Sequence, residues 1–288
     1  MTFALTAGLE ILAGISSLVL IALGLAVVFG MMRVINLAHG EFLMLGAYTA
    51  ITAVRYGVNF YVAILIVAPL VVGLLGLVVE RLVIRHLYGR IIDTMLATWG
   101  LSLLFVGLVT TFFGNTTTGI SSPIGAVTLG NANVSGYKFF IIGVALLTVT
   151  LLVLLLRKTE FGLIARATMQ NPNMASALGV DPNRTYAITF AIGAALAGLA
   201  GGVMAPITGV VPGIGASFVA KAFITVIGGG TSVVAGTLSA SGLFGAVNQV
   251  ASFLTTPVFG EVAMLFAAVI LVRLMPQGIT GRFFRGSI

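Results

Sequence analysis

The sequence predicts an all-α integral membrane protein with about eight helical membrane elements, some of them broken or re-entrant. Of its 288 residues, 59% are hydrophobic and only 7% are charged, whereas soluble domains carry about a quarter charged residues. In addition, hydrophobic runs near the ~20 residues that cross a bilayer recur along the chain. These runs lie at 8–29, 60–79, 94–113, 139–156, 186–205, 233–254 and 262–274.

The basic residues predict how these runs are oriented. They gather in three groups, which are Arg81, Arg85 and Arg90; Arg157, Lys158, Arg166 and Arg184; and Arg282 and Arg285. Because positively charged loops stay cytoplasmic, the C-terminus is predicted inside, and the uncharged loop 114–136 and the N-terminus outside. The net charge of +7 does not indicate nucleic-acid binding, since no aromatic and basic face is visible.

A polar break follows the first hydrophobic run. Residues 31–41, MMRVINLAHGE, place Asn36, His39 and Glu41 between two apolar segments, and the apolar run 42–54 that follows is too short for an untilted crossing. Non-helical backbone at membrane depth persists only where protein or a water-filled cavity satisfies it. The sequence therefore predicts a broken or re-entrant element here.

A second break repeats this design. Residues 206–215, PITGVVPGIG, follow the run 186–205 and precede a short apolar piece at 216–227. The two spans before the breaks are predicted to run in opposite directions, which suggests an inverted repeat of 8–113 and 185–279 joined by a linking span at 138–156. In transporters built this way the solute route lies near the broken helices. Residues 1–288 are predicted to form one transmembrane domain.

The longest cytoplasmic segment, 157–184, predicts a docking element. Asn171 and Pro172 are typical of a helix start, and Gly179 is typical of a helix end, so a helix of about two turns is expected. An ordinary linker is the alternative. The expected contacts with a separate cytoplasmic engine are Asn171, Met174, Ala175, Leu178 and Gly179.

Three motifs resemble those of a known family, the hydrophobic permease subunits of ABC importers for branched-chain amino acids, urea and short amides. They are VINLAHGEFLMLGAY at 34–48, GLIARATMQNPNMASALG at 162–179 and RLMPQGITG at 273–281. The resemblance covers nearly the whole chain. It implies a permease of the bacterial inner membrane that is no enzyme and binds no cofactor itself. It also implies a second homologous permease, two cytoplasmic ATPases that bind ATP, and an extracytoplasmic solute-binding protein.

Two further stretches bear on the solute. IRHLYGRIIDTMLATWGLSLLF at 84–105 and TMQNPNM at 168–174 are more similar to urea and short-amide permeases. The resemblance therefore implies urea or a short amide as the solute, with a branched-chain amino acid as the alternative within the family.

Eight residues are candidates for the solute route: Asn36, His39, Glu41, Thr94, Thr98, Trp99, Thr208 and Pro212. Ionisable groups in a membrane are costly and usually face a cavity or a partner, although Glu41 could also simply cap a helix. Thr94 and Thr98 share a helix face, where helix packing or bonding to the backbone is the alternative. A metal site is not expected, since the chain has two histidines, no cysteine and no HExxH motif.

The remaining features have simple explanations. Lys221 has no acid nearby in sequence, so it is expected to snorkel or to face the paired permease. Glycines at 193, 198, 201 and 202 predict close helix packing, with that second permease as an expected partner. A passive channel or an ion-coupled transporter would carry coupling acids at mid-membrane, but the seven acids lie mostly near span ends. A membrane-embedded enzyme would need a convergent catalytic set that the sequence does not offer.

Overall fold

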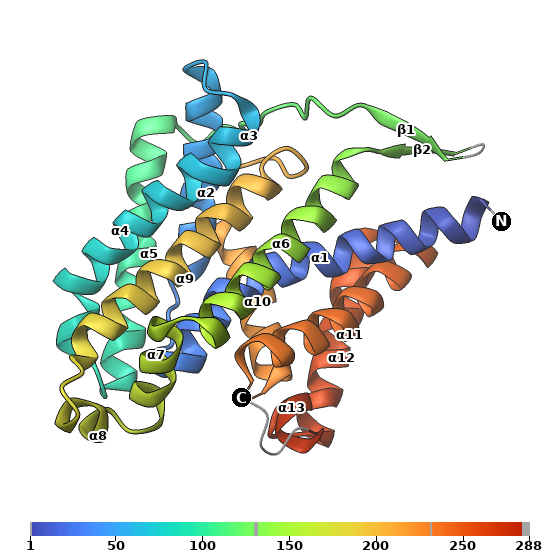
Figure 1. The fold of residues 1–288 in the computed structure, drawn as a ribbon. Helices are drawn as coiled ribbons and strands as arrows, with labels where there is room; N and C mark the ends of the chain where they lie inside the picture. Colours follow the sequence, from blue (N-terminus) through green and yellow to red (C-terminus); the bar gives the residue numbers. More distant parts are fainter. Residues whose placement is uncertain (1, 130–131, 231, 284–288) are drawn as a thin grey trace. The chain divides into compact units, whose positions relative to one another are not determined.

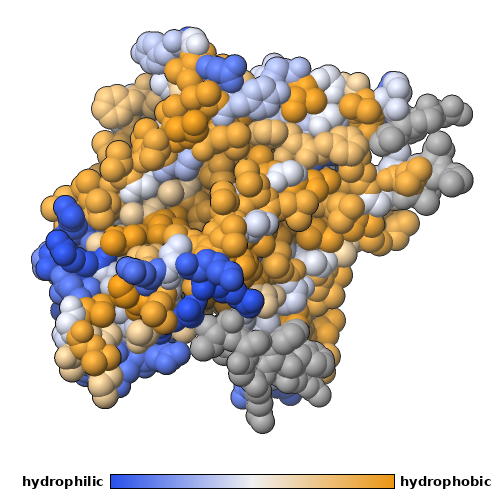
Figure 2. All heavy atoms as spheres, viewed as in Figure 1, coloured by the Kyte–Doolittle hydropathy of each residue, from blue (hydrophilic) through white to orange (hydrophobic). Residues whose placement is uncertain are grey.

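The computed structural model describes residues 2–129, 132–230 and 232–283. Seven helices among these residues are long and apolar enough to span a membrane, and each contains or overlaps one predicted hydrophobic run. They are Leu5–Met32, Phe60–Leu82, Ile91–Phe113, Tyr137–Lys158, Pro182–Met204, Val233–Leu254 and Pro257–Gly281. Hydrophobic side chains cover most of the face shown in Figure 2. The prediction of an all-α integral membrane protein is confirmed.

The elements follow one another as shown in Figure 1. The first part of the chain forms α1 (Thr2–Met32), α2 (His39–Arg55), α3 (Phe60–Val62), the π-helical turn η1 (Ala63–Val67), α4 (Ala68–Leu82), the 3-10 turn η2 (Ile84–Leu87) and α5 (Ile91–Phe113). The middle forms β1 (Ala126–Leu129), β2 (Ala132–Ser135), α6 (Tyr137–Lys158), α7 (Glu160–Gln170) and α8 (Pro172–Ala177). The last part forms α9 (Pro182–Met204), α10 (Gly215–Gly229), α11 (Val233–Leu254), α12 (Pro257–Leu274) and α13 (Gly278–Phe283).

The chain divides into two compact units. Unit 1 comprises Met1–Ala22, Ser121–Val149 and Lys221–Ile288, and unit 2 comprises Leu23–Ile120 and Thr150–Ala220. The predicted inverted repeat of 8–113 and 185–279 stays a prediction.

Unit 2 is built around α9, which packs against α2 and α4. An added Cβ on Gly201 would overlap the carbonyl oxygen of Leu43, and one on Gly198 would lie 2.7 Å from Val72 Cβ. These glycines therefore bring α9 close to helices of its own chain. The expectation that the glycines of α9 face a second permease is wrong for Gly198 and Gly201, because their neighbours lie in α4 and α2 of the same chain.

Gly201→Ala is expected to destabilise the protein, because its Cβ would meet backbone that cannot rotate away. Overpacking of this kind costs about 1–3 kcal/mol, which we expect to appear as a lower thermal midpoint in detergent. Gly100→Ala in α5 is the control, since nothing lies within 4 Å of its added Cβ. Equal midpoints for the two variants would contradict the tight contact.

Unit 1 has its own apolar core between α11 and α12. The buried residues of this core are Leu18, Ala240, Phe244, Met264, Ala268 and Leu271. Thr280 Oγ1 in α13 donates to the Gly229 carbonyl oxygen at 2.6 Å, which holds α13 against the end of α10.

The predicted outer loop contains an unexpected hairpin. Strands β1 and β2 pair antiparallel, with Val127 opposite Val134. The short strands carry no long apolar run, so the hydrophobicity pattern gave no signal for them.

Of the third basic group, Arg285 and the side chain of Arg282 lie outside the described residues.

Candidate functional site

The first predicted break is present between α1 and α2. The helix ends at Met32 and resumes at His39, and Arg33 adopts a left-handed backbone with φ of 53°. Asn36 Oδ1 accepts a hydrogen bond from the Ala38 amide at 3.1 Å, and Thr98 Oγ1 accepts one from the Leu37 amide at 3.1 Å. Polar side chains therefore satisfy backbone groups that the break releases, as membrane depth requires.

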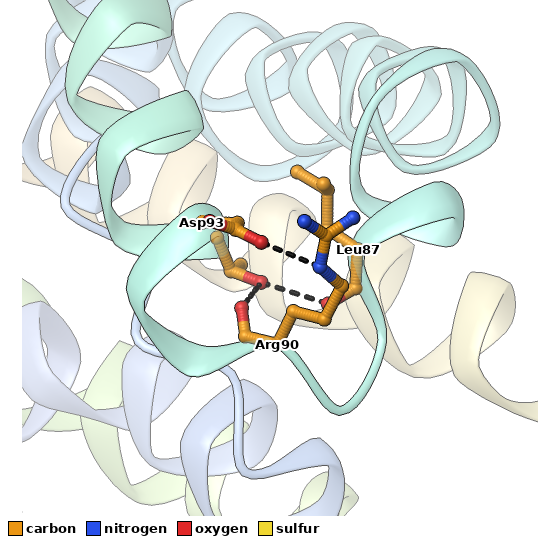
Figure 3. A network of polar contacts seen from close by, with 4 residues as sticks. Leu87, Arg90 and Asp93 are labelled. Carbon is orange, nitrogen blue, oxygen red and sulfur yellow. Dashed lines mark hydrogen bonds and ion pairs between the residues drawn. The ribbon is translucent and has the colours of Figure 1, made fainter.

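Thr98 of α5 bonds to the backbone of the break, whereas Thr94 bonds to the turn before α5. Thr94 Oγ1 lies 2.8 Å from the Arg90 carbonyl oxygen and 3.1 Å from that of Leu87. Figure 3 shows this turn, where Arg90 Nε also lies 2.5 Å from Asp93 Oδ2. Thr94 and Thr98 are both buried, whereas Trp99 is 55% exposed. Trp99 is thus not brought together with them.

The two breaks meet within unit 2. A Cβ added to Gly40, at the start of α2, would overlap the carbonyl oxygen of Gly215, at the start of α10. We call this contact the break junction. Two helix N-termini, each with a partial positive charge, therefore begin side by side. Transporters with discontinuous helices place such N-termini at the solute site.

Glu41 lies at the break junction. Its side chain is 3% exposed, and Ser102 hydrogen-bonds to its carboxylate. Among the residues that the structure describes, its second oxygen, Oε2, is buried without a hydrogen-bond partner. A buried polar atom left unpaired is costly, so this oxygen is suited to a group that arrives during transport. His39 and Asn36 are buried nearby along the chain.

Glu41→Gln keeps the shape of the side chain and removes its charge. We expect transport to fall by about tenfold to a hundredfold, since a lost contact to a charged group is worth about 1.5–3 kcal/mol. Uptake and folded yield are both measured. Glu160→Gln, an exposed acid in the first turn of α7, is the control. A fully active Glu41→Gln variant would make this acid dispensable.

The second break lies between α9 and α10 and contains the candidates Thr208 and Pro212. Thr208 Oγ1 donates to the Met204 carbonyl oxygen at 2.9 Å, in the last turn of α9, and Pro212 is buried. Val210 and Thr118 exchange two backbone hydrogen bonds of 2.9 Å. The loop after α5 is therefore tied to the second break, a link that no local pattern predicted.

A buried polar cluster near the end of α4 was missed from the sequence. The Tyr88 hydroxyl donates to Glu80, which is fully buried, and the rings of Tyr88 and Tyr186 lie 4.9 Å apart. Burial raises the pKa of Tyr88, and the bond to Glu80 raises it further, so the hydroxyl stays a neutral donor. The sequence did offer a signal for this cluster, because the acid Glu80 directly follows the apolar run 60–79.

The short helix predicted within the cytoplasmic segment is present as α8, and its docking role stays a prediction. Asn171 Oδ1 accepts from the Met174 amide at 3.0 Å, and Gly179 has a φ of 88°, which favours glycine. Met174 and Leu178 are 59% and 79% exposed, whereas Ala175 is buried. A second helix, α7, precedes it and was missed, although Thr159 caps it by accepting from the Gly162 amide at 3.2 Å.

Comparison with known proteins gives a consistent picture. Residues 8–275 match the family model described as "Branched-chain amino acid transport system / permease component". A probable branched-chain amino acid transport permease protein LivH of Methanocaldococcus jannaschii is 29% identical, over 92% of this chain and 88% of the relative. The high-affinity branched-chain amino acid permease protein BraD of Pseudomonas aeruginosa is 30% identical, over 93% and 92%. LivH of Escherichia coli is 28% identical, over 93% and 92%.

A solved structure shares the fold. PsaBC from Streptococcus pneumoniae, in complex with Fab, matches with a TM-score of 0.54 and 13% identity, over 93% of this chain and 91% of that chain. At this identity the likeness concerns the fold alone.

Proposed function

The chain belongs to the family of permease components of branched-chain amino acid transport systems, and from this premise we propose that it carries a branched-chain amino acid inward. It is a multi-pass inner-membrane permease subunit of an ABC importer, and the permease itself is not an enzyme. The relatives described above are named for branched-chain amino acids. They favour this alternative over the urea or short-amide solute that the motifs had suggested.

The family implies ATPase and solute-binding partners. Our finer proposal is a complex with a second homologous permease, two cytoplasmic ATPases that bind the ATP, and a binding protein that delivers solute outside. The exposed apolar pair Met174 and Leu178 supports α8 as the ATPase contact, since binding interfaces are built around aliphatic or aromatic anchors that fill partner pockets. The remaining docking candidates, Asn171, Ala175 and Gly179, would shape this helix.

The observation that carries the proposed mechanism is the break junction. Helices α7 and α8 contact α9, and α9 packs against α2, so a shift of α8 can reach Gly40 and Glu41 through one helix. In this proposal, closure of the ATPases moves α8, and the junction opens the solute route to alternate sides. His39, Asn36 and Glu41 would line it, while Thr98 holds the backbone of the break.

Reconstitution tests this function. Proteoliposomes that contain the complete importer should accumulate radiolabelled L-leucine only when ATP and liganded binding protein are present, and they should not accumulate urea. Uptake of urea without leucine would refute the proposed solute. Solute movement by the purified chain without any ATPase would refute the importer and favour a channel or an ion-coupled transporter.

Single cysteines test the proposed orientation, because the chain has no native cysteine. Asn115→Cys and Ser176→Cys, both at exposed positions, should react with a membrane-impermeant thiol reagent from opposite sides of sealed vesicles. The first should react from outside and the second only from the cytoplasmic side. Labelling of both from one side would overturn the topology.

A further inference from the structure

Lys221 in α10 does have an acidic partner. Its Nζ lies 2.6 Å from Oε1 of Glu261 in α12, and both residues belong to unit 1. The side chains are not sealed: 27% of Lys221 and 55% of Glu261 remain exposed. Two opposite charges are thus held next to each other at a position that the chain leaves partly exposed.

Two exposed aliphatic side chains flank Glu261 on its own helix. Val258 and Leu265 stand three residues before and four residues after Glu261, so they share its face of α12, and they are 71% and 48% exposed. Charged groups inside a membrane protein usually face a cavity, water or a partner rather than lipid. An ammonium, a carboxylate and two branched aliphatic side chains therefore lie along one accessible strip.

We propose that this strip binds the α-amino acid solute during transport. The solute carboxylate would contact Lys221 Nζ, its ammonium would contact the Glu261 carboxylate, and its aliphatic side chain would lie on Val258 or Leu265. The inference rests on the proposed amino-acid solute. It adds a recognition site within unit 1.

A second ion pair in unit 1 provides the contrast. Lys138 in α6 contacts Glu10 in α1, and each side chain is 28% exposed. The corresponding flanking positions of Glu10 are the small residues Ala7 and Gly14, which offer no aliphatic surface. This pair joins two helices and serves as a matched control for a purely structural role.

The test uses a single cysteine beside the pair. Leu265→Cys leaves both charges in place, and in the complete importer it should react with a positively charged, membrane-impermeant methanethiosulfonate reagent. L-leucine at about ten times its dissociation constant should slow this reaction about tenfold, and urea should not. Adding Lys221→Met should abolish the protection, whereas adding Lys221→Arg or Lys138→Met should preserve it.

Three outcomes would overturn the site. The first is no reaction of Leu265→Cys, which would mean that lipid or another subunit covers the strip. The second is a reaction that leucine does not slow. The third is an equal loss of protection in the Lys221→Met and Lys138→Met variants. Size-exclusion profiles of each complex establish that the variants are assembled. Wild-type leucine uptake separates the two proposals: uptake without protection refutes this site alone, and absence of uptake refutes the proposed solute.

Discussion

Replacing Leu178 by aspartate is expected to reduce ATP-driven uptake by tenfold or more. Leu178 is 79% exposed at the end of α8 and lies one turn from Met174, so the two form an apolar face with no cover of its own. Truncating a residue that anchors an interface as a hot spot costs about 2 kcal/mol or more, and a buried charge adds to that cost. Uptake and ATP hydrolysis are measured together in proteoliposomes.

Ser176→Asp is the control for this experiment. Ser176 is also exposed, but it lies on the opposite side of α8 from Met174 because successive helical residues are ~100° apart. We expect this variant to keep normal uptake, and solute capture by the binding protein to be unchanged in both. Normal coupling in Leu178→Asp would remove α8 as the docking element.

The features that sequence patterns predicted are those with local causes. The membrane spans follow from hydrophobic runs, and α8 follows from its caps: the Asn171 side chain and the left-handed backbone at Gly179 act within a few residues. The breaks were equally visible, because polar residues such as Asn36 interrupt apolar runs. Helix α7 was missed although Thr159 offered a cap signal.

The features that were missed join residues far apart in the chain. No periodicity predicts that Gly40 meets Gly215, that Lys221 pairs with Glu261, or that Tyr88 packs on Tyr186. Side-chain partners of this kind depend on how helices pack, which a single sequence does not specify. The same reason applies to Trp99. The sequence made it a candidate for the solute route, but its side chain is exposed on the surface of α5.

The second large effect is expected from Gly40→Ala. The added Cβ would overlap the carbonyl oxygen of Gly215, and neither partner is a side chain that can rotate away. Overpacking in a rigid contact costs about 1–3 kcal/mol. The helix starts of α2 and α10 would have to separate, which displaces Glu41, whose Oε1 lies 2.8 Å from the position of a Cβ added to Gly215. We expect leucine uptake to fall by at least tenfold, a larger loss than the destabilisation alone would give.

Gly213→Ala isolates the cause of that loss. Gly213 lies in the same second break as Gly215, but it is exposed and an added Cβ meets nothing within 4 Å. This variant should transport normally and keep the wild-type thermal midpoint. If Gly40→Ala assembles with the ATPases and transports at the wild-type rate, the break junction tolerates separation. A junction that accepts an added methyl group without loss of transport cannot be the element whose opening controls transport. The solute route would then have to lie away from Glu41.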